Sequence, residues 1–204
     1  MRRQRVRIAA AATMLLVAGT GQAQEKGHVA GVFGWTFGEE TDSLYGARVG
    51  VSITDTILIV GGVERMNDVL TGRYALLLNN ISAIANLDIT GKVPATYGGV
   101  GARFTFPGLA AAPFLEASFG ATRTDATGIQ FFNQNGDDVT GELPDELQQL
   151  LSEATSFTFV LGAGLRFDIG ANFLAEGTFE FFDVLANRED FRLNRLSFAA
   201  GFRF

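Results

Sequence analysis

The chain ends in the stretch Leu196-Ser197-Phe198-Ala199-Ala200-Gly201-Phe202-Arg203-Phe204, in which apolar residues alternate with small or charged ones. Because side chains alternate between the two faces of a β-strand, one face here is wholly apolar and the other carries small residues and an arginine. Residues 157–168 repeat the pattern, with Phe, Leu and Ala at odd positions and mainly Thr, Gly, Arg and Asp at even ones. The sequence therefore predicts two-faced strands rather than amphipathic helices.

The same template predicts eight strands, near residues 28–38, 44–53, 56–66, 95–106, 113–124, 156–168, 172–184 and 194–204. Lengths of about 9–13 residues suit a tilted crossing of a bilayer. Short turns at 54–55, 107–109 and 169–171 alternate with longer segments at 39–43, 67–94, 125–155 and 185–193. Short turns on the periplasmic side and long loops outside are typical of outer-membrane barrels. The predicted fold is an all-β, eight-stranded, antiparallel up-and-down transmembrane β-barrel.

A four-residue motif, Gly-apolar-Arg-apolar, begins at Gly46, Gly101, Gly164 and Gly201, once in every second predicted strand. The copies indicate equivalent hairpins that are separated by loops of different length, because a solenoid would have a fixed period. Within the long loops, residues 144–153 favour a short helix, and residues 74–87 favour a second helix or a strand extension.

Side-chain size indicates which face of the strands meets lipid. The polar face is mostly Gly, Ala, Ser and Thr, which suits the narrow lumen of an eight-stranded barrel. The other face carries more Phe than such a lumen can hold, so we expect it to point toward lipid. Aromatic girdles at both rims follow from the placement of Trp35, Phe37 and Tyr45 at one end and Phe104, Phe106, Phe173, Phe202 and Phe204 at the other. The alternative is a soluble, lipocalin-like ligand-binding barrel with Phe inside.

Residues 1–23 have the organisation of a cleaved signal peptide. Four arginines precede a short apolar run at 8–17, and Gly21-Gln22-Ala23 supplies small residues for cleavage. The run is too short for a membrane-spanning helix, which disfavours an anchor. We therefore expect a signal peptide at 1–23 and a barrel domain at 24–204.

Charge excludes one class of partner. The leader holds four of the 16 basic residues and none of the 22 acidic ones, so the formal charge falls from −6 to −10 after its removal. Nucleic-acid binding is not expected, because phosphate contacts need clustered Lys and Arg. The chain has no cysteine, which rules out disulfides and thiolate metal sites.

The strand layout and the last strand, which ends in Phe202-Arg203-Phe204, resemble the small outer-membrane β-barrel family that includes the OmpA transmembrane domain and OmpX. The resemblance covers residues 24–204. It implies location in the cell outer membrane, contact with outer-membrane lipids and lipopolysaccharide, and recognition of Phe202 and Phe204 as an assembly signal by the barrel-assembly machinery. The favoured function is a structural, surface-exposed membrane anchor whose loops make envelope or surface interactions.

Charged residues on the lumen face form the main candidate site. The alternation of side chains along each strand places these residues on the lumen face: Arg48, Arg103, Arg166, Arg195 and Arg203 together with Glu64, Glu116, Asp168, Glu176 and Glu180. Positions on either side of a turn predict that Arg103 faces Glu116 and that Arg166 faces Glu176. An unpaired buried ion is costly, so the balanced count favours a paired network that fills the lumen. The alternative is a gate in a narrow channel for ions or small solutes.

No catalytic constellation stands out. His28, the single histidine, begins the first strand, where we expect it to be exposed and incidental, and a Ser-His-acid site at the outer rim cannot be built without another histidine. We expect no enzymatic activity and no cofactor. Oxygen ligands in one loop form a weak calcium candidate, although a solvated loop is favoured because the spacing does not match an EF-hand. They belong to Asn133, Asn135, Asp137 and Asp138.

Overall fold

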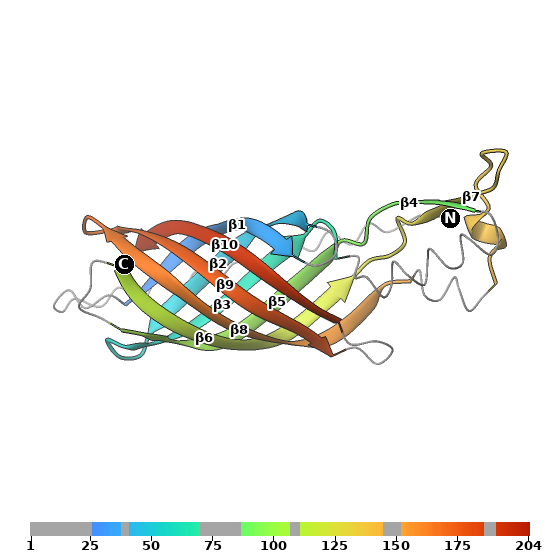
Figure 1. Ribbon diagram of the computed structural model, residues 1–204. Helices are drawn as coiled ribbons and strands as arrows, with labels where there is room; N and C mark the ends of the chain where they lie inside the picture. Colours follow the sequence, from blue (N-terminus) through green and yellow to red (C-terminus); the bar gives the residue numbers. More distant parts are fainter. Residues whose placement is uncertain (1–25, 38–40, 70–86, 107–110, 145–151, 186–190) are drawn as a thin grey trace, which may run out of the picture.

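The computed structural model describes residues 26–37, 41–69, 87–106, 111–144, 152–185 and 191–204. Eight strands form a closed, wholly antiparallel barrel (Figure 1). They are β1 (Gly27–Phe37), β2 (Thr41–Ser52), β3 (Ile57–Met66), β5 (Ala95–Thr105), β6 (Ala111–Thr124), β8 (Ala154–Ile169), β9 (Phe173–Leu185) and β10 (Phe191–Arg203). The eight-stranded barrel is therefore confirmed, with strand boundaries shifted by a few residues.

The wall closes where β1 pairs with β10. The N–H groups of Lys26 and Gly27 donate to the carbonyl oxygen of Phe204 at 2.8 and 3.1 Å, and the N–H of Phe204 donates to the carbonyl of Gly27 at 3.0 Å. On the outer face of this seam the rings of Phe33 and Phe198 stack with their centroids 5.7 Å apart. Each of the eight strands thus has two neighbours, which leaves none of them with an unpaired edge.

The two ends of the barrel differ. The β2–β3 and β8–β9 connections and the contact between Gly27 and Phe204 lie at one end, here called the turn end, where Gly170 (φ 64°) forms part of a tight turn. The β3–β5 and β6–β8 connections lie at the opposite, loop end. There, β4 (Asp88–Thr90) pairs with β7 (Gln130–Phe132), and a short 3-10 helix, η1 (Thr140–Glu142), follows.

Residues 87–94 and 125–144, named here the loop-end extension, project well beyond the barrel (Figure 1). Its small sheet was not predicted from the sequence, because strands of three residues give too short a pattern to recognise. The helices predicted at 74–87 and 144–153 fall largely outside the described residues. No helix among the described residues is long and apolar enough to cross a membrane.

The outer wall is apolar around the barrel. Large side chains that include Trp35, Tyr45, Phe119 and Phe181 are exposed on it, as are the expected girdle residues Phe104, Phe106, Phe173, Phe202 and Phe204. The Phe-rich face therefore points outward, as predicted. A lipocalin-like barrel is not supported, because such a fold needs an apolar, hollow interior and a polar exterior.

The loop end of the lumen is filled by apolar side chains, in contrast to the mostly small or polar inward face predicted from the sequence. Five of them form a layer, named here the loop-end seal: Leu44, Met66, Phe182, Val184 and Leu193. Val69, Val93, Ile129 and Phe131 of the adjoining segments continue the same buried cluster into the extension. The seal went unnoticed in the sequence because each strand contributes only one or two of these residues.

Candidate functional site: the lumen charge network

Close packing of the strands determines where the lumen arginines can lie. In the Gly-apolar-Arg-apolar motif, the glycine and the arginine share the inward face. A Cβ on Gly101 would lie 2.3 Å from the carbonyl oxygen of Ala117, and one on Gly201 would lie 2.0 Å from that of Val29. Both distances are far shorter than van der Waals contact, so these positions accept only glycine without a shift of the wall. The motif therefore places each arginine two residues from a glycine whose missing side chain leaves room for a residue of the neighbouring strand, such as Ser118 beside Gly101.

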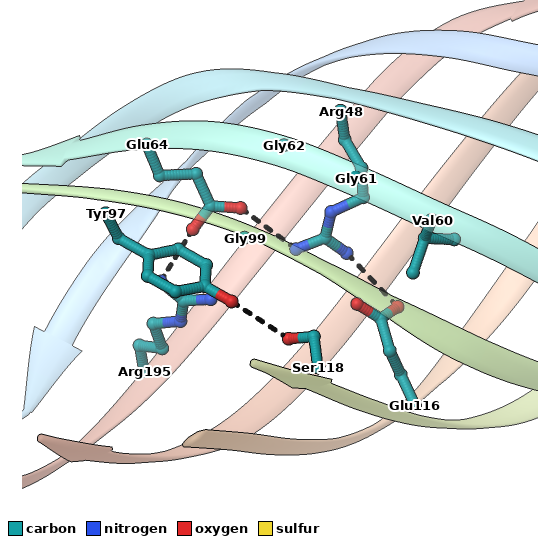
Figure 2. A pocket seen from close by; sticks show the side chains of 10 residues that line it. All are labelled: Arg48, Val60, Gly61, Gly62, Glu64, Tyr97, Gly99, Glu116, Ser118 and Arg195. Carbon is teal, nitrogen blue, oxygen red and sulfur yellow. Dashed lines mark hydrogen bonds and ion pairs between the residues drawn. The ribbon is translucent and has the colours of Figure 1, made fainter. Parts of the chain in front are cut away.

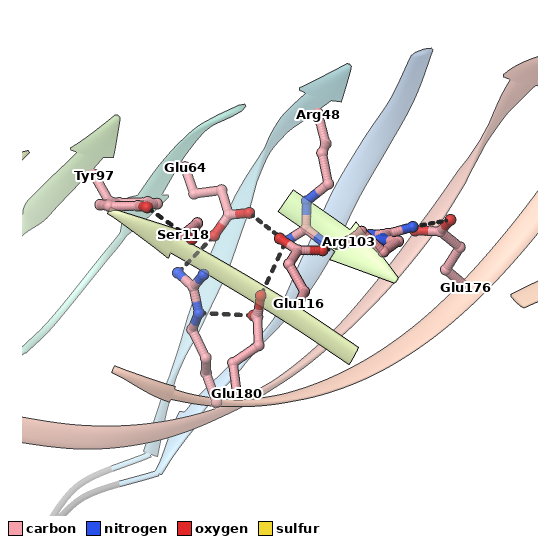
Figure 3. Close-up of polar contacts among 9 residues, drawn as sticks. Arg48, Glu64, Tyr97, Arg103, Glu116, Ser118, Glu176 and Glu180 are labelled. Atoms are coloured by element: carbon pink, nitrogen blue, oxygen red, sulfur yellow. Dashed lines mark hydrogen bonds and ion pairs between the residues drawn. The ribbon is translucent and has the colours of Figure 1, made fainter. Parts of the chain in front are cut away.

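Four buried residues near the seal alternate in charge. Arg48 Nη2 contacts Glu64 Oε1 at 3.0 Å and Glu180 Oε1 at 3.1 Å. Arg195 contacts the second oxygen of each acid, Glu64 Oε2 at 2.6 Å and Glu180 Oε2 at 2.8 Å. The four side chains come from β2, β3, β9 and β10, so the ring joins separate parts of the wall (Figures 2 and 3). Arg195 also lies 4.6 Å from the ring centroid of Phe182, which connects the charges to the seal.

A second group lies nearer the turn end. Arg103 Nη2 contacts Glu116 Oε2 at 2.8 Å, its Nε donates to the same oxygen at 2.9 Å, and its Nη1 contacts Glu176 Oε1 at 2.5 Å. The guanidinium carbon lies 4.0 Å from the ring centroid of Phe114. Arg48 Nη1 lies 3.7 Å from Glu116 Oε2, which links this group to the ring (Figures 2 and 3). The predicted contact between Arg103 and Glu116 is present.

The remaining predicted charges lie at the turn-end mouth. Asp168 accepts from Arg166 Nε at 2.9 Å through one oxygen and contacts Arg203 Nη1 at 3.0 Å through the other. Its side chain is 47% exposed, so Asp168 lies at the mouth of the lumen and apart from the enclosed charges. Arg166 and Glu176 are register partners in β8 and β9, as predicted, but Glu176 forms its 2.5 Å ion pair with Arg103.

A small cavity lies among the charges (Figure 2). Its volume is about 10 Å³, enough for roughly one water molecule. Tyr97 and Ser118 line it and share a hydrogen bond of 3.1 Å between their hydroxyl oxygens. The enclosed part of the network holds four arginines and four glutamates, all at most 8% exposed, so their formal charges cancel. The lumen is filled rather than open.

The structure places His28 inside the barrel, and the prediction that it is exposed is wrong. The side chain is fully buried, and neither ring nitrogen has a hydrogen-bond partner among the described residues. Its ring lies over Gly50, where an added Cβ would come within 2.3 Å of Cε1. The signal was present in the sequence, since His28 shares the parity of the buried residues Ala30 and Val32.

In the loop predicted as a weak calcium candidate, the side-chain oxygens of Asn133 and Asp138 accept hydrogen bonds from the loop itself. Asn133 Oδ1 accepts from the backbone N–H groups of Asn135 and Asp137 at 2.9 and 3.0 Å. Asp138 Oδ1 accepts from the backbone N–H and the hydroxyl of Thr140 at 2.9 and 2.6 Å, and these hydrogen bonds lower the pKa of Asp138. Within the described ranges, no group of three or more His, Cys, Asp or Glu side chains is placed to hold a metal ion.

Comparison with known proteins gives the class of fold. No protein-family model matches the sequence, and no curated protein matches it either. Among solved structures, the chain is similar to Ail, the attachment invasion locus protein of Yersinia pestis, with 12% identity, a TM-score of 0.53, and coverage of 89% of this chain and 99% of Ail. Ail in complex with the heparin analogue sucrose octasulfate gives 10% identity and a TM-score of 0.51 over the same shares.

Neisserial surface protein A is also similar, with 12% identity, a TM-score of 0.50, and coverage of 87% of this chain and 94% of that one. At these identities the likeness shows the fold alone. The fold of this chain is that of the small, eight-stranded outer-membrane β-barrels, as the sequence resemblance implied.

Proposed function

We propose that this protein is an integral outer-membrane protein in which the barrel is a rigid anchor and the loop-end extension is presented at the cell surface. The observation that carries the proposal is the combination of an apolar outer wall with a lumen filled by paired ions and an apolar seal. Apolar residues around a barrel require lipid as their surroundings, and barrels with short turns on one side place those turns in the periplasm.

The filled lumen favours an anchor over a channel. A path for ions would have to pass the loop-end seal and then separate buried ion pairs such as Arg103–Glu116 and Arg195–Glu64. Planar-bilayer recording tests this directly, and we expect no stable unitary currents. Currents that change when Arg103 or Glu116 is substituted would favour the channel instead.

The surface role is assigned to the loop-end extension, which carries five acidic residues and one lysine, Lys92, within residues 87–94 and 125–144. Its acidic excess favours a cationic or cation-bridged contact over a polyanion such as the heparin analogue bound to Ail. No catalytic role is proposed, because the single histidine is enclosed in the lumen.

Export and assembly complete the proposal. Residues 1–23 act as a cleaved signal peptide, so N-terminal sequencing of the mature protein should begin at Gln24. Phe202 and Phe204 are exposed on the outer face of the last strand, where the barrel-assembly machinery can recognise them.

The decisive experiment is membrane fractionation combined with gel electrophoresis of heated and unheated samples. We expect the mature protein to be in the outer membrane, to need detergent for extraction, and to migrate differently before and after heating. A folded product that stays dispersed in plain buffer would contradict the proposal.

A further inference from the structure

Charged residues on the outer wall are confined to the loop end. Among the described outward-facing strand residues they are Arg65, Arg123, Asp183 and Arg192, each within two residues of the loop end of its strand. A lipid-facing arginine is costly at the middle of a bilayer and tolerated near its surface. This position therefore corresponds to the headgroup level of the outer leaflet.

The four charges form two pairs on different parts of the wall. One pair has opposite charges and the other has like charges. Asp183 and Arg192 are register partners in β9 and β10, and their side chains form an ion pair of 3.2 Å. Arg65 and Arg123 instead lie on either side of Thr96, which is the register partner of both. Their backbones are about 10 Å apart, since neighbouring strands are spaced by about 4.8 Å. Two like charges thus lie in one row across β3, β5 and β6.

Hydroxyl groups extend the row on both sides. Tyr45 is the register partner of Arg65, and Thr155 is that of Arg123. The next outward residues toward the turn end are Val63, Gly98 and Ala121, so the row borders the apolar wall directly. Hydrogen-bond donors that adjoin an apolar surface suit the junction between a polar headgroup and its acyl chains.

We propose that Arg65 and Arg123, together with the hydroxyl groups of their row, bind the phosphate groups of the lipid A part of lipopolysaccharide. This inference rests on the proposed outer-membrane location. The planar guanidinium group matches phosphate with two parallel hydrogen bonds, and a row with two such groups suits a headgroup with two phosphates.

Nearby acids compete with the phosphates and modulate this affinity. Arg123 contacts Glu153, and both side chains are about half exposed. The carboxylate of Asp125 accepts hydrogen bonds from the N–H and hydroxyl of Thr127 at 3.0 and 2.5 Å, and both arginines add to its stabilisation. Glu153 must therefore release Arg123 when a phosphate binds, which makes its removal a sensitive test.

Native mass spectrometry of the folded protein in detergent, titrated with bisphosphorylated lipid A, measures the binding. For Arg65→Gln/Arg123→Gln we expect affinity to fall about tenfold or more, because charge-assisted hydrogen bonds are lost. Arg192→Gln is the matched control and should leave affinity unchanged, because Arg192 lies on another part of the wall, outside the row that holds the two arginines. Glu153→Gln should raise affinity several-fold, since it frees Arg123.

Three results would overturn the inference: equal binding by the double variant, equal binding of dephosphorylated lipid A, or no preference for lipid A over phosphatidylglycerol. Loss of binding in EDTA would also overturn it, because the acids would then be bridging to the lipid through divalent cations. Heat-modifiable migration shows whether each variant has folded and inserted, and so distinguishes failure of this inference from failure of the proposed function. An Arg65→Gln/Arg123→Gln variant that inserts but shows no change in lipid A binding contradicts this inference alone, whereas a wild-type protein that does not insert contradicts the proposed function.

Discussion

Replacing Arg103 by methionine tests how much the lumen network stabilises the barrel. Arg103 is fully buried and contacts Glu116 at 2.8 Å and Glu176 at 2.5 Å. In the variant, Glu116 keeps its contact with Arg48 at 3.7 Å, but Glu176 loses its contact with Arg103. Methionine is also unbranched, and it is apolar, so the main change is that the enclosed network holds one negative charge in excess.

The expected loss in the free energy of unfolding follows from the burial of the ion pair. Removing one partner of a buried ion pair destabilises proteins by roughly 3–5 kcal/mol, because the other charge is left without compensation. Loss of the contact between Arg103 and the Phe114 ring adds up to about 2 kcal/mol. The double variant Arg103→Met/Glu176→Gln removes the uncompensated charge, so we expect it to regain at least half of the lost stability.

Equilibrium unfolding in urea, with the protein folded into lipid vesicles, measures these differences. Trp35 is the single tryptophan and lies on the outer wall, so its fluorescence reports transfer from lipid to water. Arg192→Met is the control, because this exposed arginine pairs with Asp183 at 3.2 Å and such pairs contribute about 0–1 kcal/mol. If Arg103→Met costs no more than the control, or if the double variant is no more stable than the single one, the reasoning about the network is refuted.

Three further changes test other parts of the molecule. Gly101→Ala should destabilise the barrel by roughly 1–3 kcal/mol in the same urea assay, because the new Cβ meets the Ala117 carbonyl and the strands must move apart. Unchanged stability would show that the strands move apart at little cost in free energy. Met66→Ala should cost roughly 2–5 kcal/mol and speed hydrogen exchange in the loop-end extension, since it leaves a void in the seal. Hydrogen bonds from Thr140 lower the pKa of Asp138. The contribution of these hydrogen bonds to the stability of the loop is therefore complete above the ordinary carboxyl pKa, and it is lost as the pH falls through the lowered pKa. Carboxyl titration by NMR checks this, and exchange of the Thr140 amide that stays slow after full protonation would contradict it.

The barrel could be predicted from the sequence because its wall follows a single rule. Every strand alternates between lipid and lumen, so a period of two residues, read in stretches such as 196–204, identifies all eight strands. Parity also identified the lumen charges, and symmetry around a short turn identified the contact between Arg103 and Glu116. These features depend on neighbouring strands and are therefore encoded locally.

The features that sequence analysis missed depend on contacts across the barrel. Arg103 pairs with Glu176 from β9, 73 residues away in the chain, and no local pattern encodes that distance. His28 is the exception, because its alternation with the outward residues of its own strand indicates the inward placement that its position at the start of the strand obscures. The loop-end seal is assembled from β2, β3, β9 and β10, so its apolar character is visible only when the strands are arranged in a ring.

The position of Arg48 has a mechanical consequence. Hydrogen bonds in the wall join each strand only to its two neighbours, whereas Arg48 of β2 also contacts Glu116 of β6 and Glu180 of β9. These ion pairs cross the lumen and connect β2 to strands that lie three places away in the wall. When lateral pressure in the bilayer changes, a cylinder braced in this way should resist flattening better than a hollow one of equal strand number.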